Sequence, residues 1–480
     1  MYLGLDLGTS GLKGVLIEDT QAVIGHATAA LSVSRPQSGW SEQEPSQWLR
    51  VAEEVLDALA AKHDLSAVKG IGLSGQMHGA TLLNDADEVL RPCILWNDTR
   101  SHAEAAAMDA DPRFRDLTGN IVFPGFTAPK LAWIRKHEPE IFDRVAKVLL
   151  PKDYLRLWLT GEHVAEMSDA AGTGWLNTAK RDWSDELLRA TGLDRTHMPR
   201  LIEGSEVSGT LRRELCARWG LGAETVVAGG GGDNAASAVG MGAVQNGQAF
   251  LSLGTSGVLF AANDSYSPDA ASAVHTFCHA LPGRWHQMGV ILSAGDALNW
   301  FAKVSEAKAS DLTSALGNVQ APGRAIFLPY LGGERTPHND ARVRGAFVGL
   351  EHAADRTAMT RAVLEGVAFA FADCRDALIA TGTTLERATA VGGGSLSPHW
   401  LQIMANATGL ALDVPVSGDF GGAFGAARLG MMAAEHVGGE IATPPNIHHT
   451  VEPDPALASA FADAHARYRA ASAAIRSLSV

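Results

Sequence analysis

The sequence predicts an α/β protein made of two related domains, and three observations support this prediction. The chain has 480 residues, which exceeds the size of one ordinary hydrophobic core. Strand-like segments that end in glycines alternate with amphipathic helical segments along most of it. Finally, a seven-residue motif occurs twice, as LDLGTSG from Leu5 and as LSLGTSG from Leu251, at an offset of 246 residues (251 minus 5). That offset is about half the chain, so each half opens with the same strand and turn.

The first element, LGLDLGTSGLKGVLIE (residues 3–18), is expected to be a strand, a tight turn and a returning strand. The side chains of a strand alternate between two faces, so Leu3, Leu5 and Leu7 form an apolar face that is suited to burial. Asp6 lies on the other face between two glycines, which leave open space around its carboxylate. A simple hairpin favours Val or Thr at such a position. Asp6 is therefore either a local turn-former or part of a site.

The second copy of the motif helps to distinguish these two roles. It carries Ser252 where the first copy carries Asp6, although the rest of the turn is unchanged. The acid is thus not required to form the turn. We therefore favour a chemical role for Asp6 over a structural one.

The remaining elements continue the alternation in order along the chain. Glycine-containing segments, each expected to be a strand followed by a loop or a small-residue helix, lie at 69–75, 225–242, 388–409 and 410–433. Apolar residues at three- and four-residue spacing predict amphipathic helices at 44–63 and 355–382. The boundary is expected just before the second motif, which gives domains 1–244 and 245–480. The last helix, which starts near residue 455, could belong to either half.

The composition is typical of a well-packed globular protein and argues against two classes of binding partner. Hydrophobic residues make up 46% of the chain and charged residues 19%. Lysine and arginine number 39 against 53 acidic residues, a net charge of −14, which argues against binding to nucleic acid or anionic lipid. The four cysteines stand singly, so we expect buried free thiols in a reducing compartment. With neither a signal-peptide pattern nor an apolar stretch of membrane-spanning length, a cytoplasmic protein is expected.

Glycine-rich turns that precede helices offer backbone amides to phosphate groups. The chain has two GTSG turns and two GGG loops, one of each kind in either half. A single loop of this type is weak evidence, but four of them in two similar halves fit a nucleotide held in a cleft between the halves. There is no GxxxxGK[ST] P-loop, and no GxGxxG followed by a suitably placed acid, which argues against the common mononucleotide and dinucleotide folds.

Longer motifs are distributed along essentially the whole chain. They are DLGTSGLK (6–13), GLSGQMHGATLL (72–83), ILWNDTRS (94–101), PGFTAPKLAWIRKHEP (124–139), LLPKDYLRLWLTG (149–161), SDAAGTGWL (168–176), GGGDNAA (230–236), LSLGTSG (251–257), FLPYLGGERTPHN (327–339) and GAFVGL (345–350). With these motifs the chain resembles the FGGY family of carbohydrate kinases. The resemblance implies two actin-like, ribonuclease H-like ATPase domains with the active site in a cleft between them. It also implies ATP and Mg²⁺ as cofactors, a small sugar as substrate and a homodimer as one expected assembly.

The resemblance implies which groups react in the first half. Asp233 is implied to be the catalytic base that accepts the proton of the attacking sugar hydroxyl; from the residues alone, an N-cap aspartate is an equally good interpretation. Asp6 would stand near the magnesium ion that bridges the β- and γ-phosphates, through water. Thr9, Ser10 and Lys13 lie on the same turn and would meet the transferring phosphate. The alternative for Lys13 is a solvated strand lysine.

Further residues are implied for the sugar and the nucleotide. Met77 and His78 would lie against a ketose, with His78 bonding a hydroxyl, and Asn234 would be a second sugar contact. The QMHG sequence is typical of family members that phosphorylate xylulose. In the second half, Gly254 and Thr255 would meet the phosphates. The implied nucleoside contacts are Gly393, Gly394 and Ser395.

Five residues near these motifs fit structural roles as well as they fit contact with substrate. They are Trp96, Asn97, Asp98, Lys152 and Asp153. Glu334 and Arg335 lie in an expected interdomain loop. We predict that these two side chains pair with each other rather than contact substrate.

The resemblance therefore implies a kinase that transfers the γ-phosphoryl group of ATP to the terminal hydroxyl of D-xylulose. Catalysis would rest on positioning and charge neutralisation, with water excluded by domain closure. One alternative keeps the family and changes the sugar to ribulose, gluconate, fuculose or glycerol. A second is an actin- or Hsp70-like ATPase, against which the full-length match to sugar kinases argues. A third, a nucleotide-sensing repressor, would need a helix-turn-helix extension or a basic face, and the sequence has neither.

Overall fold

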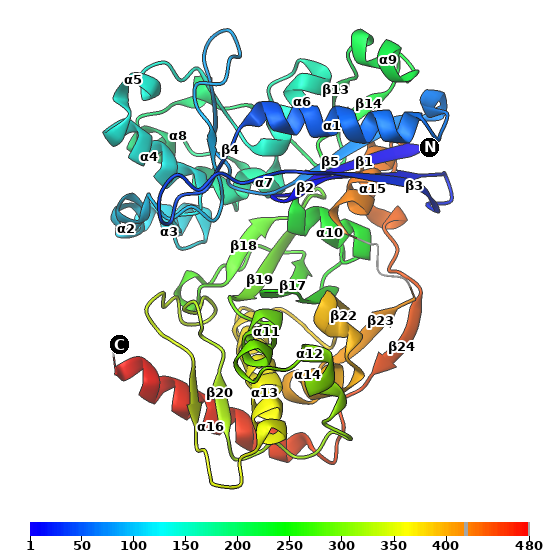
Figure 1. Ribbon diagram of the computed structural model, residues 1–480. Coiled ribbons are helices and arrows are strands. Elements are labelled where there is room, and N and C mark those ends of the chain that lie inside the picture. The colour runs from blue at the N-terminus through cyan, green and yellow to red at the C-terminus, as the bar shows by residue number, and fades with distance from the viewer. Residues whose placement is uncertain (417–420, 479–480) are drawn as a thin grey trace.

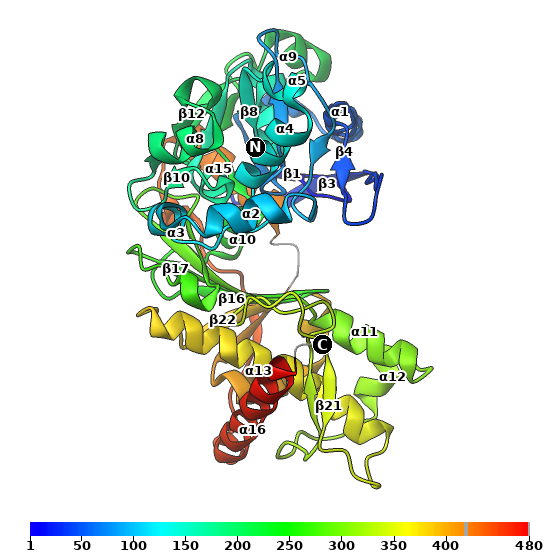
Figure 2. The same cartoon turned by 90° about the vertical axis from the view of Figure 1, so that its left-hand side faces the viewer.

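The computed structural model describes residues 1–416 and 421–478, so part of the predicted loop, 417–420, lies outside the described residues. The molecule has two domains, one above the other in Figure 1 and in the perpendicular view of Figure 2. Each domain is built around a seven-stranded mixed sheet flanked by helices. The two-domain α/β architecture predicted from the sequence is confirmed.

The two large sheets have the same order of strands, which confirms the internal duplication. The first runs β13 (Val207–Thr210), β14 (Val226–Ala228), β5 (Gly70–Gly75), β1 (Tyr2–Leu7), β2 (Gly11–Ile17) and β3 (Val23–Ala30), with β15 (Gly231–Gly232) also on β5. The second runs β24 (Ile447–Val451), β23 (Ala411–Pro415), β22 (Arg387–Val391), β16 (Ala249–Leu253), β17 (Gly257–Asn263), β19 (Trp285–Ile291) and β18 (His275–Cys278). In both sheets the strand of the repeated motif is antiparallel to the strand after its turn and parallel to a later one.

Shorter elements surround the first sheet and extend the second domain. Two-stranded ladders join β4 (Glu42–Gln43) to β7 (Cys93–Ile94), β6 (Thr81–Leu83) to β8 (Lys147–Leu149), β9 (Val164–Glu166) to β12 (Arg200–Ile202), β10 (Leu176–Asn177) to β11 (Asp182–Trp183), and β20 (Ile326–Leu328) to β21 (Ala346–Val348). The small helices are α2 (His102–Asp109), α3 (Pro112–Thr118), α4 (Thr127–His137), α5 (Pro139–Phe142), α7 (Met167–Ala170), α8 (Asp185–Thr191) and α12 (Ala309–Ser314).

The leucine face of β1 is buried, as its alternation predicts. Its three leucines are fully buried in one apolar cluster with α1 (Pro45–Ala60), α6 (Pro151–Thr160) and α9 (Arg213–Trp219). Removing each such side chain from water contributes about 1.5–3 kcal/mol to folding. These helices therefore fix one side of the sheet that carries the first GTSG turn.

The opposite face of the first sheet is covered by α15 (Gly422–Glu435), which comes from the second half of the chain. A Cβ atom at Gly4 would lie 1.8 Å from a carbonyl oxygen of this helix, and one at Gly72 would lie 1.7 Å from another. Glycine is needed at these positions because the helix backbone rests directly on the strands. The expectation that the glycines leave open space around Asp6 is therefore wrong on the side of Gly4, where a helix of small residues fills that space. At Gly8 a Cβ atom would meet no atom nearer than 3.4 Å.

Helix α15 also packs on α10 (Asp233–Met241), and the two helices lie between the large sheets (Figure 1). A Cβ atom at Gly425 would lie 1.7 Å from the carbonyl oxygen of Ala236, so the two helix backbones are in direct contact. On its other side, α10 places Met241 in the cluster that contains Phe250 of the second sheet. Each half of the chain thus contributes one helix to the junction, and the domains interlock.

The core of the second domain lies around its longest helix. Its main helices are α11 (Gly295–Val304), α13 (Arg356–Ala380), α14 (Pro398–Thr408) and α16 (Ala458–Ser477). The last helix, which the sequence left with either half, packs on this domain, with 6.2 Å between the ring centroids of Phe461 and Phe369. All four cysteines are buried and free, as expected. Of the helices that the structure describes, none is both long and apolar enough to cross a bilayer.

Candidate active site

Three neighbouring parallel strands of the first sheet end at the same edge. The register of β1, β5 and β15 sets Asp6 opposite Ser74, and Ser74 opposite Gly231. The segments that follow these strands are the GTSG turn, the QMHG loop and the start of α10. Because the carboxyl ends of parallel strands meet at one edge, the fold brings Asp6, His78 and Asp233 to one region.

Asp6, near the end of β1, faces the start of α15. Its Oδ1 atom accepts a hydrogen bond of 2.8 Å from the Ser74 hydroxyl, and a Cβ atom at Gly422 would lie 2.9 Å from the same oxygen. Burial raises the pKa of Asp6, while the Ser74 hydrogen bond and the charge of Lys13 act in the opposite direction. The amino-terminal end of a helix is electropositive, so α15 favours negative charge here, on Asp6 itself or on a bound phosphate.

Asp233 is the first residue of α10, one position after the N-cap residue Gly232. Its Oδ1 atom accepts hydrogen bonds from the backbone N–H (2.7 Å) and the side-chain amide (3.0 Å) of Asn234. Its Oδ2 atom has no hydrogen-bond partner in the described part of the chain. Burial and the nearby charge of Asp6 raise the pKa of Asp233 to about 6, although Asn234 lowers it. Asp233 is thus not the N-cap that the sequence offered as an alternative.

His78 follows β5 in a left-handed backbone conformation, with φ of 69°. Its carbonyl oxygen accepts hydrogen bonds from Lys130 Nζ (2.7 Å) and the Thr127 hydroxyl (3.2 Å) of α4. Its Nδ1 atom lies 2.6 Å from the carbonyl oxygen of Gly172, which can only accept, so Nδ1 carries the proton. Burial, with the charges of Lys130 and Arg335, lowers the pKa of His78 to about 3. The ring is therefore neutral, and Nε2 is a hydrogen-bond acceptor.

An aromatic wall lies beside His78, and it consists of Phe123, Phe126, His275 and Phe277. His78 stacks on Phe126 with 4.8 Å between ring centroids, and the Phe277 ring lies 6.3 Å away. His275 and Phe277 belong to β18, so the wall is shared by the two domains. Sequence reasoning missed it because single aromatic residues far apart in the chain give no local signal.

Met77 connects the QMHG loop to the start of α10, and Asn234 is the second residue of that helix. A Cβ atom at Gly172 would lie 2.8 Å from Met77 Cε, and one at Gly232 would lie 3.0 Å from its Sδ. Met77 is buried, so its side chain fills the space between these two glycines. The Asn234 side chain is partly exposed and donates to Asp233.

Hydrogen bonds of Thr9 connect the first GTSG turn to two neighbouring segments. The Thr9 hydroxyl donates to Gln76 Oε1 (2.8 Å) and accepts from the indole N–H of Trp96 (2.9 Å). Ser10 is exposed in the turn, and Lys13 stands opposite the aspartate of β1 in the β1–β2 ladder. Trp96, whose role the sequence left open, is 48% exposed and supports the turn rather than the core.

The other undecided residues have mostly structural partners. Asp98 is buried and binds Arg100, with 2.7 Å between Oδ2 and Nη2. Lys152 and Asp153 are fully buried and pair with each other at 2.8 Å between Nζ and Oδ1. The Oδ1 atom of Asn97 is buried without a hydrogen-bond partner among the residues described.

The predicted pairing of Glu334 with Arg335 is wrong. Glu334 Oε1 accepts hydrogen bonds from the backbone N–H groups of Leu292 (3.0 Å) and Arg335 (2.8 Å), and no ion pair joins the two side chains in the described structure. Glu334 Oε2 is buried without a hydrogen-bond partner among the described residues, and the Arg335 guanidinium lies against the aromatic wall instead. It lies 4.3 Å over the ring of Phe123 and 3.3 Å from Nε2 of His275.

The glycine loops of the second domain lie side by side. Gly254 and Thr255 follow β16, whereas Gly393, Gly394 and Ser395 follow β22 in a short 3₁₀ helix. The two strands are parallel neighbours, which places the loops at one edge. The Gly254 carbonyl oxygen accepts a hydrogen bond of 2.7 Å from the start of α11, so the turn is held against that helix.

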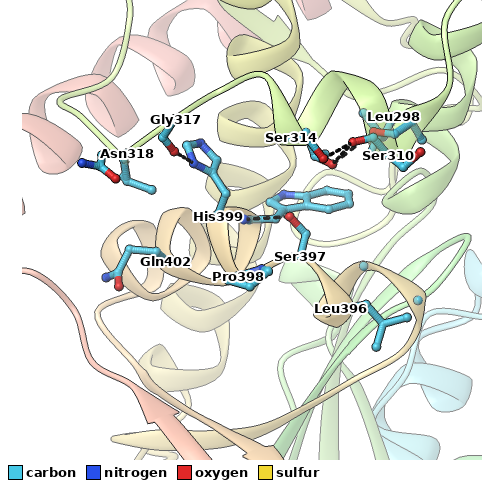
Figure 3. Close-up of a pocket in the computed structure, with 16 residues that line it drawn as sticks. Leu298, Ser310, Ser314, Gly317, Asn318, Leu396, Ser397, Pro398, His399 and Gln402 are labelled. Carbon is cyan, nitrogen blue, oxygen red and sulfur yellow. Dashed lines mark hydrogen bonds between the residues drawn. The ribbon is translucent and has the colours of Figure 1, made fainter.

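A cavity of about 750 Å³ opens beside the glycine loop that follows β22 (Figure 3). It is lined by α12, by the segment that follows α12 and by the start of α14. Gly393 and Gly394 line it, but Ser395 does not. The Nδ1 atom of His399 lies 2.9 Å from the carbonyl oxygen of Gly317, and both residues line the cavity (Figure 3). The volume of the cavity lies in the range of sites that bind small molecules.

Comparisons with known proteins agree with this architecture. The model of the N-terminal domain of the FGGY family of carbohydrate kinases matches residues 1–240, and that of the C-terminal domain matches residues 249–434. The chain is 51% identical over 437 residues to the xylulose kinase of Escherichia coli (strain K12), which covers 90% of each protein. The crystal structure of a "xyloylose kinase" from Brucella ovis matches with a TM-score of 0.98 at 60% identity, covering 99% of both chains. That of a xylulose kinase from Rhodospirillum rubrum gives 0.93 at 29% identity with the same coverage.

The two domain models cover the first sheet, all of the second sheet except β24, and both pairs of glycine loops. The matches together span most of the chain and both of its domains. This protein belongs to the FGGY family of carbohydrate kinases.

Proposed function

We propose that this protein transfers the γ-phosphoryl group of ATP to the terminal hydroxyl of D-xylulose, forming D-xylulose 5-phosphate. Similarity to xylulose kinases over most of the chain supports the choice of sugar. The observation that carries the chemistry is the carboxylate of Asp233, which keeps one oxygen without a partner among the described residues. It lies close enough to Asp6 for the charge of Asp6 to raise its pKa.

Asp233 serves as the general base in this proposal. With a pKa of about 6 it is mostly ionised at pH 7 and still basic enough to accept a proton. The sugar oxygen forms a bond to the γ-phosphorus, its proton passes to Asp233 Oδ2, and the bond from phosphorus to the bridging oxygen of ADP breaks. Asn234 holds Oδ1, which leaves Oδ2 for the sugar hydroxyl. Asp233 then releases the proton to water.

The proposed magnesium ion fits a site whose ligands come mainly from the nucleotide and water. No group of three or more His, Cys, Asp or Glu side chains in the described residues could hold a metal by itself. Mg²⁺ commonly binds through one or two carboxylates, phosphate oxygens and water, and the Asp6 carboxylate would hold it through one of these waters. When bound, the ion neutralises charge on the β- and γ-phosphates. The proposed phosphate contacts are Thr9, Ser10 and Lys13 in the first turn and Gly254 and Thr255 in the second.

We place the nucleoside in the cavity of Figure 3, because Gly393 and Gly394 line it. Ser395 supports the same loop, since its hydroxyl donates to the carbonyl oxygen of Gly392 at 2.7 Å. The sugar would lie against the QMHG loop. There His78 Nε2 accepts a hydrogen bond from a hydroxyl, Met77 packs behind it, and the Asn234 amide is a second contact.

The test is ADP formation measured side by side with D-xylulose, D-ribulose and glycerol. We expect D-xylulose to give the highest kcat/KM and Asp233→Ala to lose about 10²–10⁴-fold in kcat while remaining folded. Preference for another sugar would change the substrate, and near-normal turnover by Asp233→Ala would remove the base. ADP formation that needs no sugar would favour the actin- or Hsp70-like ATPase.

A further inference from the structure

A group of charged side chains is fully buried in the first domain, next to the ends of β5 and β15. We call it the buried ion cluster, and it comprises Lys152, Asp153, Arg156, Glu166 and Asp169, each with no exposed side-chain surface. Charged side chains are rarely buried completely unless they are paired, and removing them from water is costly. Hydrophobic residues would fill the same space, so stability alone does not explain this cluster.

Lys152 is the centre of the cluster. Its Nζ atom lies 2.8 Å from Asp153, 2.9 Å from Asp169 and 3.3 Å from Glu166, and Arg156 Nη1 lies 2.6 Å from Asp153. Burial raises the pKa of Asp169 to about 8, although Lys152 lowers it. Three buried carboxyl groups therefore surround two buried cations at this point.

The cluster is bonded to both ends of the glycine loop 229–232. At one end, the backbone N–H of Gly232 donates to Ser168 Oγ at 3.0 Å, and Ser168 Oγ donates to Glu166 Oε1 at 3.0 Å. At the other end, Arg156 Nη2 donates to the carbonyl oxygen of Gly229. Asp233 is the next residue of the chain.

The glycine loop has no side chains by which the fold could hold it. A Cβ atom at Gly229 would lie 2.3 Å from a backbone oxygen, and Gly230 has φ of 79° and would place a Cβ atom 2.2 Å from another. Glycine is therefore required, yet it is the most flexible residue. Only the backbone N–H and carbonyl groups of this segment can therefore bond to the rest of the fold, and the cluster bonds to two of them.

We propose that the buried ion cluster, acting through Ser168 and Arg156, holds the loop 229–232 and thereby fixes the position of Asp233. Ser168 and Arg156 are positioning residues, because they act on the base through the backbone. The proposal rests on the proposed function of Asp233. Proton transfer depends on sub-ångström placement, so a loosened loop should lower turnover more than binding of ATP.

Ser168→Ala tests the proposal with the smallest change, since it removes one hydroxyl and leaves the charges in place. We expect kcat for D-xylulose to fall about 10- to 100-fold, with KM for ATP unchanged. The acid limb of the pH profile of kcat should also move, because the surroundings of Asp233 change. Ser168→Thr, which restores a hydroxyl, should recover most of the activity.

Ser208→Ala is the matched control. Ser208 is a buried serine whose hydroxyl donates to the carbonyl oxygen of Val227 at 2.8 Å, close to the loop but outside the cluster. Its removal should leave kcat and the pH profile unchanged. Equal effects of Ser168→Ala and Ser208→Ala, with Asp233→Ala inactive, would overturn this proposal alone. An active Asp233→Ala would instead overturn the proposed function.

A measurement on the unmodified protein covers the case in which Ser168→Ala does not fold. Amide hydrogen exchange of Gly232 should be as slow as that of Ile71 in the core of β5, because its N–H is held by Ser168. Fast exchange at Gly232 in the intact enzyme would show that the loop is not clamped, and would overturn the proposal without any variant.

Discussion

At the residue scale, the surroundings of Asp233 determine the pH range of the reaction. Burial and the charge of Asp6 raise its pKa to about 6, so the carboxylate loses its proton as the pH rises through 6. Only the ionised form can accept the sugar proton. We predict that kcat/KM for D-xylulose is constant from about pH 7 upward and falls tenfold per unit below about pH 6. A coupled ADP assay from pH 5 to 8 measures the midpoint, and a midpoint near 4 would contradict the assignment.

His78 gives a second prediction at this scale. Its Nε2 atom is the proposed acceptor for a sugar hydroxyl, and asparagine tolerates its left-handed backbone conformation. His78→Asn should therefore fold and raise KM for D-xylulose up to about 10-fold, the cost of one hydrogen bond, without changing KM for ATP. Because the pKa of His78 is about 3, KM of the unmodified enzyme should not depend on His78 between pH 6 and 8. Equal rises in both KM values would indicate a general disturbance of the fold.

Single residues also show what the sequence could reveal about the site. Asp6 lies between two glycines of a strand, and Asp233 follows a run of glycines. Both could be identified as candidate site residues, because such surroundings are unusual for strands and helices. The pairing of Glu334 with Arg335 was predicted from adjacency alone. It is wrong because the Arg335 guanidinium packs over the ring of Phe123 and beside His275, contacts with residues far away in the chain that adjacency could not reveal.

At the scale of elements, the glycines of the first sheet allow the backbone of α15 to pack directly on the strands. At Gly72 an added Cβ atom would lie 1.7 Å from a carbonyl oxygen of α15, and backbone cannot move aside cheaply. We predict that Gly72→Ala lowers the free energy of unfolding by about 1–3 kcal/mol or more. Gly222→Ala is the control, because its Cβ atom would meet nothing nearer than 3.6 Å, and it should change stability by less than about 0.5 kcal/mol. Urea unfolding measures both, and equal values would contradict this account.

Elements were predicted well where their signal is local. The hairpin of the first motif, its second copy and the helix at 44–63 follow from alternation, self-similarity and spacing along the chain. The sequence did not predict which element covers the face of the first sheet that carries Gly4 and Gly72. That element, α15, begins roughly 350 residues after β5 ends. Small residues in both elements were visible in the sequence, but their contact is a property of the fold.

At the scale of the whole molecule, the two halves of the sequence are not two independent bodies. The boundary near residue 244 remains a prediction, yet α15 from the second half covers the first sheet and packs on α10. Detaching either domain would expose the glycine face of β1 and β5. The duplication predicted two similar folds, and it gave no indication that they share helices across their junction.

This interlocking predicts that the protein unfolds in one cooperative step. Eight of the 11 tryptophans precede residue 245, so tryptophan fluorescence reports mainly on the first domain, whereas far-ultraviolet circular dichroism reports on both. The two thermal transitions should coincide. Gly72→Ala should lower both by the same few degrees. A non-hydrolysable ATP analogue, whose nucleoside we place in the second domain, should raise both together, because ligand binding stabilises the whole cooperative unit. Two separate transitions, with the analogue shifting only one of them, would show that the contacts of α15 and α10 are too weak to couple the domains.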